Sequence, residues 1–247
     1  MNMKQLIYAI VIFYVFVACK PEPPLATKTV VVLYDLSASV DKTSLENYET
    51  FSNLIFDKLQ QGDVMLGAKI SENSITERNH ICELKLPLFE PTSTNTIIKN
   101  QEKITYDKMV SSKTKEAKTS LHNTLFEDHS SVNKTDILSA IKASEQIFNT
   151  YPASKQILVI CSDMLEAEET VNFEKKNPDK AFLDNLIKSQ TSKGTFPNLK
   201  NITVIVEGAN AGNNDQFFAV QNFWIEYFKA TGASIEKQNY AAHLTEF

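Results

Sequence analysis

The fold of this chain follows from the stretch Val30-Val31-Val32-Leu33-Tyr34-Asp35-Leu36-Ser37-Ala38-Ser39, in which an unbroken apolar run ends in a carboxylate and two hydroxyls. A run of β-branched residues without polar alternation predicts a strand that is covered on both faces, as central strands of parallel sheets are. Ligands of open α/β sheets bind beyond the carboxyl ends of such strands. We therefore expect Asp35, Ser37 and Ser39 to lie at a binding site.

Length and composition are typical of one globular α/β domain. The chain has 247 residues, of which 43% are hydrophobic, and only 6 Gly and 8 Pro. This length is sufficient to bury a full core. The formal charge of -5 comes without a basic stripe, so nucleic acid is not an expected partner.

The N-terminus reads as an export signal. Lys4 precedes thirteen apolar residues, 6–18, and a membrane span needs about 20. Phe16-Val17-Ala18-Cys19 resembles a bacterial lipobox, which implies that residues 1–18 are removed and that Cys19 is lipidated. Residues 19–26 are a proline-rich tether, and residues 27–247 are the folded domain. The expected location is the bacterial cell envelope, on the periplasmic or surface side of a membrane; a short membrane helix is the alternative.

Two further cysteines follow the tether. Cys82 and Cys161 could form a disulfide in an oxidising compartment. Because they fall in different predicted strands, we expect buried free thiols instead.

The first half of the domain predicts one helix and an edge hairpin. Residues 41–44, Asp-Lys-Thr-Ser, supply helix caps, and Thr43 and Glu46 have the spacing of a capping box. The helix that follows should end at Gly62. Residues 63–70 and 81–89 alternate as strands with no helix between them. They should pair antiparallel at one edge of the sheet.

The second half alternates helix and strand, which predicts parallel pairing. Residues 92–126 are polar and Lys-rich and form one or two solvated helices whose boundaries the sequence leaves open. The remaining elements are helices at 137–148, from Asn177-Pro178 and at 217–228, and strands at 156–161, 201–206 and 233–235. The predicted fold is a single doubly wound, mostly parallel sheet with helices on both faces and one antiparallel edge strand.

The pattern Asp35-x-Ser37-x-Ser39 resembles the first element of the metal-ion-dependent adhesion site of von Willebrand factor A domains. That site also requires a Thr before a later helix and an Asp at the end of the next buried strand. Thr135 and Asp163 meet both requirements in order. The resemblance implies a Rossmann-like α/β fold and a protein-binding, non-enzymatic module.

The resemblance also implies a ligand set. Ser37, Ser39 and Thr135 would coordinate the ion directly, while Asp35 and Asp163 would lie close to it or act through water. These hard oxygen donors suit a divalent cation, Mg²⁺ first, with Mn²⁺ or Ca²⁺ as alternatives. An open coordination position would accept an acidic side chain of a protein partner.

Two neighbouring positions depart from the family pattern. Lys134 precedes Thr135 and Met164 follows Asp163, where the family often carries glycine. We therefore expect altered loop geometry at both places. An acidic loop with Glu166, Glu168 and Glu169 could form a rim of the site and add negative charge.

Other interpretations remain open. Ser37 and Ser39 could be ordinary turn residues, with Thr135 and Asp163 as caps. A metal-dependent phosphohydrolase is one alternative function, since a hard cation polarises phosphoryl oxygens. A structural envelope module with an unused site is another. Residues 208–214 lack the Lys-Ser/Thr of a P-loop, and no G-x-S-x-G or H-E-x-x-H motif occurs.

Overall fold

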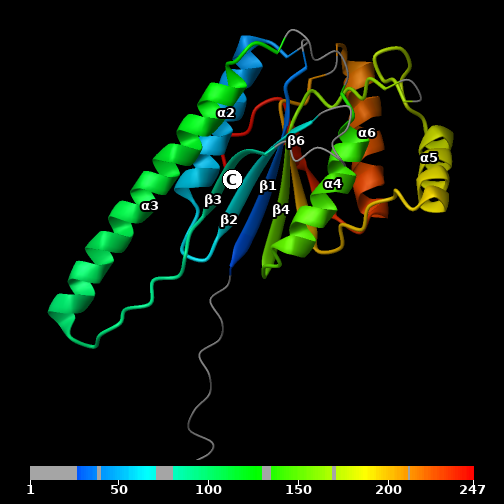
Figure 1. Ribbon diagram of the computed structural model, residues 1–247. Helices are drawn as coiled ribbons and strands as arrows, with labels where there is room; N and C mark the ends of the chain where they lie inside the picture. The colour runs from blue at the N-terminus through cyan, green and yellow to red at the C-terminus, as the bar shows by residue number, and fades with distance from the viewer. Residues whose placement is uncertain (1–26, 38–39, 71–79, 130–134, 169–170, 211) are drawn as a thin grey trace, which may run out of the picture.

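The computed structural model describes residues 27–37, 40–70, 80–129, 135–168, 171–210 and 212–247. These residues form three layers, with a central sheet between two groups of helices (Figure 1). The strands are β1 (Lys28–Asp35), β2 (Val64–Ile70), β3 (His80–Lys85), β4 (Lys155–Cys161), β5 (Ile202–Glu207) and β6 (Ser234–Ala241). The helices are α2 (Lys42–Asp57), α3 (Thr96–Leu125), α4 (Ile137–Thr150), α5 (Lys180–Lys193) and α6 (Asn214–Ala230).

The strand order places a switch point beside β1. The sheet runs β3-β2-β1-β4-β5-β6, and every neighbouring pair is parallel except β2 and β3. The chain moves outward from β1 to β2 and β3, then returns to the other side of β1 with β4. The carboxyl ends of β1 and β4 therefore flank the crevice where ligands of such sheets bind. The predicted fold class and antiparallel edge strand are confirmed.

Strand β1 is buried on both faces, as its sequence predicts. Val30, Val32 and Tyr34 belong to a core beneath α2 and α3. Val31 and Leu33 belong to a second core beneath α4 and α6. Alternate residues thus anchor opposite layers, which fixes the register of the strand that delivers Asp35.

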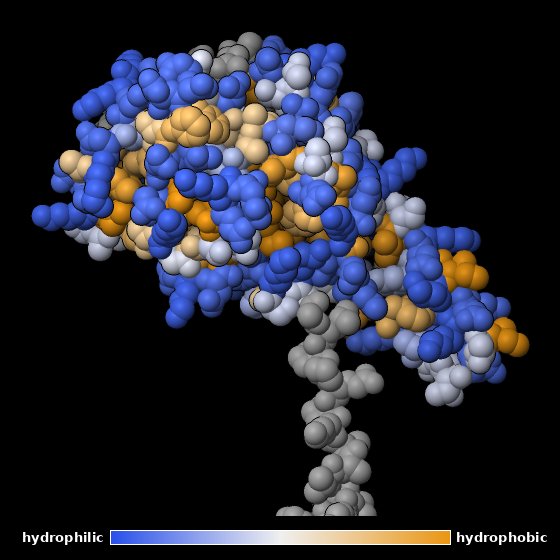
Figure 2. All heavy atoms as spheres, turned by 180° about the vertical axis from the view of Figure 1, so that it is seen from behind, coloured by the Kyte–Doolittle hydropathy of each residue, from blue (hydrophilic) through white to orange (hydrophobic). Residues whose placement is uncertain are grey.

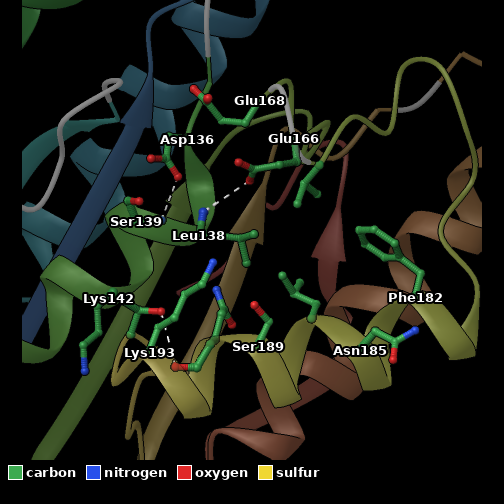
Figure 3. Close-up of a pocket in the computed structure, with 14 residues that line it drawn as sticks. Asp136, Leu138, Ser139, Lys142, Glu166, Glu168, Phe182, Asn185, Ser189 and Lys193 are labelled. Atoms are coloured by element: carbon green, nitrogen blue, oxygen red, sulfur yellow. Dashed lines mark hydrogen bonds between the residues drawn. The ribbon is translucent and has the colours of Figure 1, made fainter.

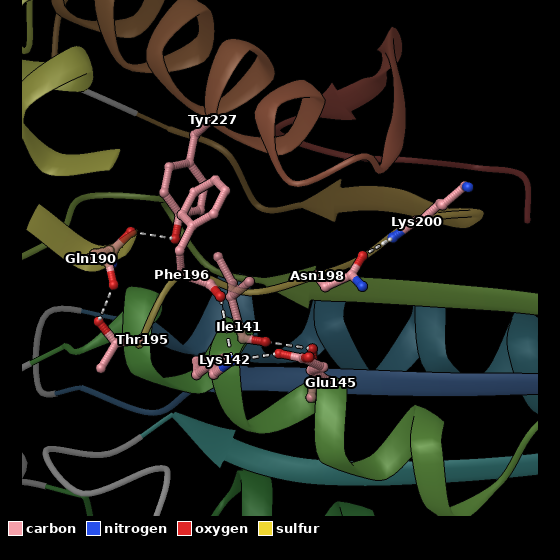
Figure 4. Close-up of polar contacts among 10 residues, drawn as sticks. Ile141, Lys142, Glu145, Gln190, Thr195, Phe196, Asn198, Lys200 and Tyr227 are labelled. Carbon is pink, nitrogen blue, oxygen red and sulfur yellow. Dashed lines mark hydrogen bonds and ion pairs between the residues drawn. The ribbon is translucent and has the colours of Figure 1, made fainter. Parts of the chain in front are cut away.

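Polar contacts join the layer of α4, α5 and α6 (Figure 4). The Lys142 ammonium on α4 donates to the Phe196 carbonyl at 3.3 Å, in the segment that follows α5. The Tyr227 hydroxyl on α6 donates to Gln190 Oε1 on α5 at 2.9 Å. Helix α5 buries Leu183 and packs the partly buried Phe182, Leu186 and Ile187 against the core, and these polar contacts add to that packing.

Several local predictions were wrong. Helix α2 ends at Asp57 instead of at Gly62, and β3 ends at Lys85 instead of at residue 89. Among residues 41–44, from which we expected the cap of α2, Asp41 is the N-cap and accepts a hydrogen bond from the Ser44 amide at 2.8 Å, so the capping box predicted at Thr43 was wrong. Helix α5 is capped by Asp179 rather than begun at Asn177-Pro178. The final strand β6 has 8 residues instead of the three expected at 233–235, because its exposed positions hide the apolar pattern.

The state of the two thiols is clear in the structure. Cys82 and Cys161 are buried and free, as expected. Among the helices of the described ranges, none is long and apolar enough to cross a membrane. Cys19 and the predicted signal peptide lie outside the described residues.

Candidate metal centre

The candidate site begins where β1 ends. Asp35 is 2% exposed, and its Oδ1 atom accepts a hydrogen bond from the Ser37 amide at 3.0 Å. The Ser37 side chain also bonds to this carboxylate. This local turn follows from the sequence, because an Asp side chain readily accepts from the amide two residues later. Asp35 and Ser37 are thereby held together at the carboxyl end of the sheet.

Two other loops join them. The Thr135 hydroxyl, which precedes α4, forms a hydrogen bond with the Asp35 carboxylate. Asp163 follows β4, and it is close enough to Asp35 for the charge of one carboxylate to act on the other. The structure therefore brings together Asp35, Ser37, Thr135 and Asp163 from three separate loops.

Burial makes both carboxylates costly to ionise. Burial raises the pKa of Asp35, against the opposing hydrogen bonds from Ser37, Ser162 and Thr135. Burial, with the charges of Asp35 and Glu174, raises the pKa of Asp163 to about 7 although the Leu165 amide donates to it at 2.8 Å. Neither Asp35 nor Asp163 forms a salt bridge with another described residue. A bound cation would supply the missing positive charge.

The residue that sequence reasoning missed is Ser162. It is fully buried, and its hydroxyl donates to Asp35 Oδ2 at 2.8 Å while accepting from the Met164 amide at 3.0 Å. Its signal in the sequence is only its place directly before Asp163, at the end of an apolar strand. Ser162 orients Asp35 from the neighbouring strand.

Met164 takes the backbone shape that glycine would take in its place. Its φ is 67°, in the left-handed region that favours glycine, and its side chain is fully buried. Its carbonyl accepts a hydrogen bond from Trp224 Nε1 at 2.9 Å. The loop after Asp163 is therefore held in its turn by the hydrogen bond from α6 and by the burial of the Met164 side chain.

Tyr48 and Gly208 lie against each other at the same edge of the sheet. Tyr48 on α2 is buried, and burial, together with charges that include those of Asp35 and Asp163, raises its pKa. Gly208 follows β5 with φ +92°, and a Cβ there would lie 2.9 Å from the Tyr48 hydroxyl. The close approach of this loop to α2 thus requires glycine.

Glu166, one of the three acids expected at the rim, does not lie on the surface. Glu166 is fully buried at the start of α4, where its Oε2 atom accepts from the amides of Ile137 at 3.0 Å and Leu138 at 3.2 Å. Its Oε1 atom has no hydrogen-bond partner in the described part of the chain. Burial raises the pKa of Glu166, and the charges of Asp136 and Glu168 raise it further. Glu166 thus serves the helix N-terminus, where its Oε2 atom accepts from two otherwise unpaired amides.

A cleft of about 590 Å³ lies beside this loop, between α4 and α5. In Figure 3, Asp136, Glu166 and Glu168 gather at one end of the cleft, and Lys142 and Lys193 lie at the other. The cleft is separate from Asp35 and Asp163, which do not line it.

Four residues named from the sequence, Ala38, Ser39, Lys134 and Glu169, lie outside the described residues. The donors that are described are two carboxylates and the hydroxyls of Ser37 and Thr135, all hard oxygen ligands. No group of three His, Cys, Asp or Glu side chains able to hold a metal occurs in the described ranges. The candidate centre is therefore hydroxyl-rich, and its donor set fits Mg²⁺, Mn²⁺ or Ca²⁺ better than zinc.

The sequence matches no protein-family model and no curated protein. The fold is similar to a von Willebrand factor type A protein from Catenulispora acidiphila, at 13% identity and TM-score 0.45 over 85% of this chain and 38% of that chain. It is also similar to manganese-loaded TRAP from Plasmodium vivax, at 12% identity and TM-score 0.42 over 87% and 68% of the two chains. A third likeness is to a PilB minor pilin from Streptococcus sanguinis, at 12% identity and TM-score 0.45 over 88% and 58%.

These likenesses concern the fold alone. The chain spans less than two thirds of the Catenulispora protein and of the pilin.

Proposed function

We propose that this protein is a membrane-anchored von Willebrand factor A-like module that binds a divalent cation and, through it, a protein partner in the cell envelope. Asp35, Ser37, Ser39, Thr135 and Asp163 hold the cation, with Mg²⁺ as the first candidate and Mn²⁺ or Ca²⁺ as alternatives. The lipidated Cys19 holds the module at the membrane.

The observation that carries the proposal is the pair Asp35 and Asp163. Both side chains end central strands at the switch point, both have raised pKa values, and neither has a salt-bridge partner among the described residues. A buried and a partly buried acid side by side, without a cationic partner among the described residues, are unfavourable as carboxylates unless something positive binds them. Hydroxyl donors beside them are suited to a hard cation.

The partner follows from the charge of the ligand set. Hydroxyls are neutral, so an ion held mainly by Ser37, Ser39 and Thr135 keeps part of its positive charge. A carboxylate from an Asp or Glu of the partner would complete its coordination. This gives binding that depends on the cation and on an acidic residue in the partner.

Binding is favoured over phosphoryl hydrolysis by the state of Asp35. Its Oδ1 atom accepts from the Ser37 amide and its Oδ2 atom accepts from Ser162, so both oxygens are engaged. Such a carboxylate orients ligands well but is a poor nucleophile. We therefore propose a module without catalytic activity.

Cation binding is tested by calorimetric titration of the protein with MgCl₂, MnCl₂ and CaCl₂. We expect binding that disappears in Asp35→Asn, with a matching loss of the rise in melting temperature. Asp179→Asn is the control, because that exposed carboxylate caps α5 and the amide can accept the same hydrogen bond from Phe182. Equal titration curves for the two variants would refute the metal assignment.

Partner binding is tested by affinity capture from the native envelope, with wild type and Asp35→Asn compared in Mg²⁺ and in chelator. We expect one set of captured proteins that needs both Asp35 and the cation. Capture that ignores chelation would contradict the proposal and place the interface elsewhere on the surface.

Membrane anchoring needs its own test. We expect Cys19→Ala to block incorporation of labelled palmitate, while the wild-type chain is labelled and remains in the membrane fraction. Labelling of the Cys19→Ala chain would contradict lipidation at this residue.

A further inference from the structure

Helix α3 extends beyond the lower end of the sheet (Figure 1). Its buried side chains, Ala117, Leu121 and Leu125, all lie in its second half. We call residues 86–108, the first part of α3 with the segment before it, the α3 tip. Most of the exposed large apolar side chains of the described residues lie there: Leu88, Ile97, Ile98 and Ile104. In Figure 2 the projection at lower right carries separate hydrophobic groups among hydrophilic and intermediate ones.

The α3 tip is an ordered structure. Asn95 caps the helix by accepting from the Ile97 amide at 2.9 Å. On the inner side, the rings of Phe89 and Tyr106 are 5.4 Å apart, and the Tyr106 hydroxyl donates to the Pro87 carbonyl at 2.8 Å. Since these aromatic residues occupy the side that faces the preceding segment, the isoleucines are held outward. Ile97 remains 71% exposed and Ile104 56% exposed.

The outward side of α3 combines apolar and basic residues. Ile97 and Ile104 are seven residues apart and share one face, on which Lys108 and Lys115 follow at helical spacing. Within the α3 tip, Lys99, Lys103 and Lys108 are balanced by Glu90, Glu102 and Asp107, whereas the rest of α3 carries three lysines and one carboxylate. The exposed isoleucines are confined to the first turns and form no stripe along α3, so only the α3 tip is suited to enter a bilayer interface, where Lys108 on the same face would meet anionic phosphates.

The described chain begins beside the α3 tip. A Cβ on Gly62 would lie 2.9 Å from Thr27 Cγ2 and 3.0 Å from Leu88 Cδ2, so Thr27 and Leu88 pack against the same point. Cys19 lies eight residues before Thr27, a stretch that spans at most about 28 Å when extended. A lipid on Cys19 would therefore keep this end of the sheet close to the bilayer.

We propose that the α3 tip docks on the anionic bilayer to which the chain is anchored, with Ile97 and Ile104 in the interfacial region. This inference rests on the proposed lipid anchor at Cys19. Because β1 begins at this end and delivers Asp35 at its other end, docking would turn the candidate metal centre away from the membrane. The module would thus present its partner-binding edge outward.

The test uses the single tryptophan of the chain. Trp224 is fully buried, so a tryptophan placed on the surface adds a distinct, exposed emission. Ile97→Trp reports on the α3 tip. Phe218→Trp is the matched control, since Phe218 is 56% exposed near the start of α6, which follows the opposite end of the sheet. The processed, lipidated proteins are purified from membranes and reconstituted into phosphatidylglycerol vesicles with and without brominated acyl chains.

Brominated lipid should remove most of the added emission of Ile97→Trp and leave that of Phe218→Trp unchanged. The quenching should weaken when Ile104→Glu is combined with Ile97→Trp. Vesicle-bound protein with an unquenched Ile97→Trp emission would overturn the proposal, and so would equal quenching of the two tryptophans. Self-association of the chain that shields Ile97→Trp from the lipid would also overturn it, in favour of a second copy as the occupant.

Docking by the α3 tip can be tested separately from the lipid anchor and from the metal centre. Sedimentation of the Phe218→Trp protein with vesicles reports on the anchor, and chelator reports on the metal centre. Quenching of Ile97→Trp should be the same with Mg²⁺ and with chelator. Quenching that requires the cation would contradict docking by the α3 tip.

Discussion

The Ser162 hydroxyl donates a hydrogen bond to Asp35 Oδ2 at 2.8 Å, and this contact joins the end of β4 to the end of β1 across 127 positions of sequence. Ser162 also accepts from the Met164 amide, so one buried hydroxyl sets both the Asp35 carboxylate and the loop that follows Asp163. Orientation of the candidate ligands therefore depends on a residue outside the ligand set.

Ser162→Ala should weaken cation binding without removing a ligand. Partners that orient metal ligands typically contribute about 10- to 100-fold in affinity, which is the loss we expect in the calorimetric titration. The variant should also lower the free energy of unfolding by about 1 to 3 kcal/mol, because a buried acceptor and a buried amide lose their partner.

Ser192→Ala is the control for this change. Ser192 lies exposed at the end of α5, where its hydroxyl donates to the Ser189 carbonyl at 2.8 Å. Its loss should leave affinity and stability close to wild type. Unchanged cation affinity in Ser162→Ala would mean that Asp35 is oriented by Ser37 and Thr135 alone.

The burial of β1 on both faces was predicted correctly because its sequence is an unbroken run of apolar residues. Six consecutive residues, 29–34, are almost fully buried. The apolar run from Val30 predicts this burial without any information on which strands lie beside β1. The proximity of Asp35 and Asp163 was predicted through the family resemblance, and the sheet explains it, since acids that follow two neighbouring parallel strands lie at one edge.

The rest depended on tertiary contacts. The role of Ser162 could not be predicted because it depends on β4 lying beside β1, and the sequence does not show which strands are neighbours. Glu166 looked like a surface acid, yet it is buried because the unpaired amides at the start of α4 require an acceptor. Helix α3 was indistinct because only three of its 30 residues are buried, which leaves little apolar periodicity to read.

Gly208→Ala should destabilise the fold more than Gly194→Ala. Both glycines have positive φ, +92° and +70°, so each alanine adds about 1 to 2 kcal/mol of backbone strain. Only at Gly208 does the new Cβ meet a side chain, 2.5 Å from Tyr48 Cε1, whereas nothing lies within 4 Å at Gly194. Displacing Tyr48 should add about 1 to 3 kcal/mol, as overpacking does.

Denaturant unfolding of the two glycine variants measures this difference. Because Tyr48 lies beside the candidate metal centre, Gly208→Ala should also reduce cation affinity, whereas Gly194→Ala should not. Equal destabilisation by the two substitutions would show that Tyr48 moves aside freely.

The pH dependence of stability should reveal the buried Glu166. Burial raises its pKa well above 4.5, so above pH 4.5 the folded state holds a proton that the unfolded state has released. Stability from this group is therefore complete below pH 4.5 and falls as the pH rises toward the folded pKa, by at most about 1.4 kcal/mol per pH unit. Glu166→Gln keeps the acceptor for Ile137 and Leu138 without the titration, so its free energy of unfolding should fall less steeply with pH.

Asp41 is the control, because its pKa is shifted in the direction opposite to that of Glu166. The Ser44 amide holds the pKa of this exposed N-cap below 3.8, so its contribution is present above pH 3.8 and is lost as the pH falls through the folded pKa. Asp41→Asn should therefore flatten only the acid limb of the stability curve, while Glu166→Gln changes the limb above pH 4.5. Denaturant unfolding at a series of pH values separates the two effects. If the free energy of unfolding of wild type and of Glu166→Gln changed in parallel above pH 4.5, Glu166 would ionise in the folded state as readily as in the unfolded state.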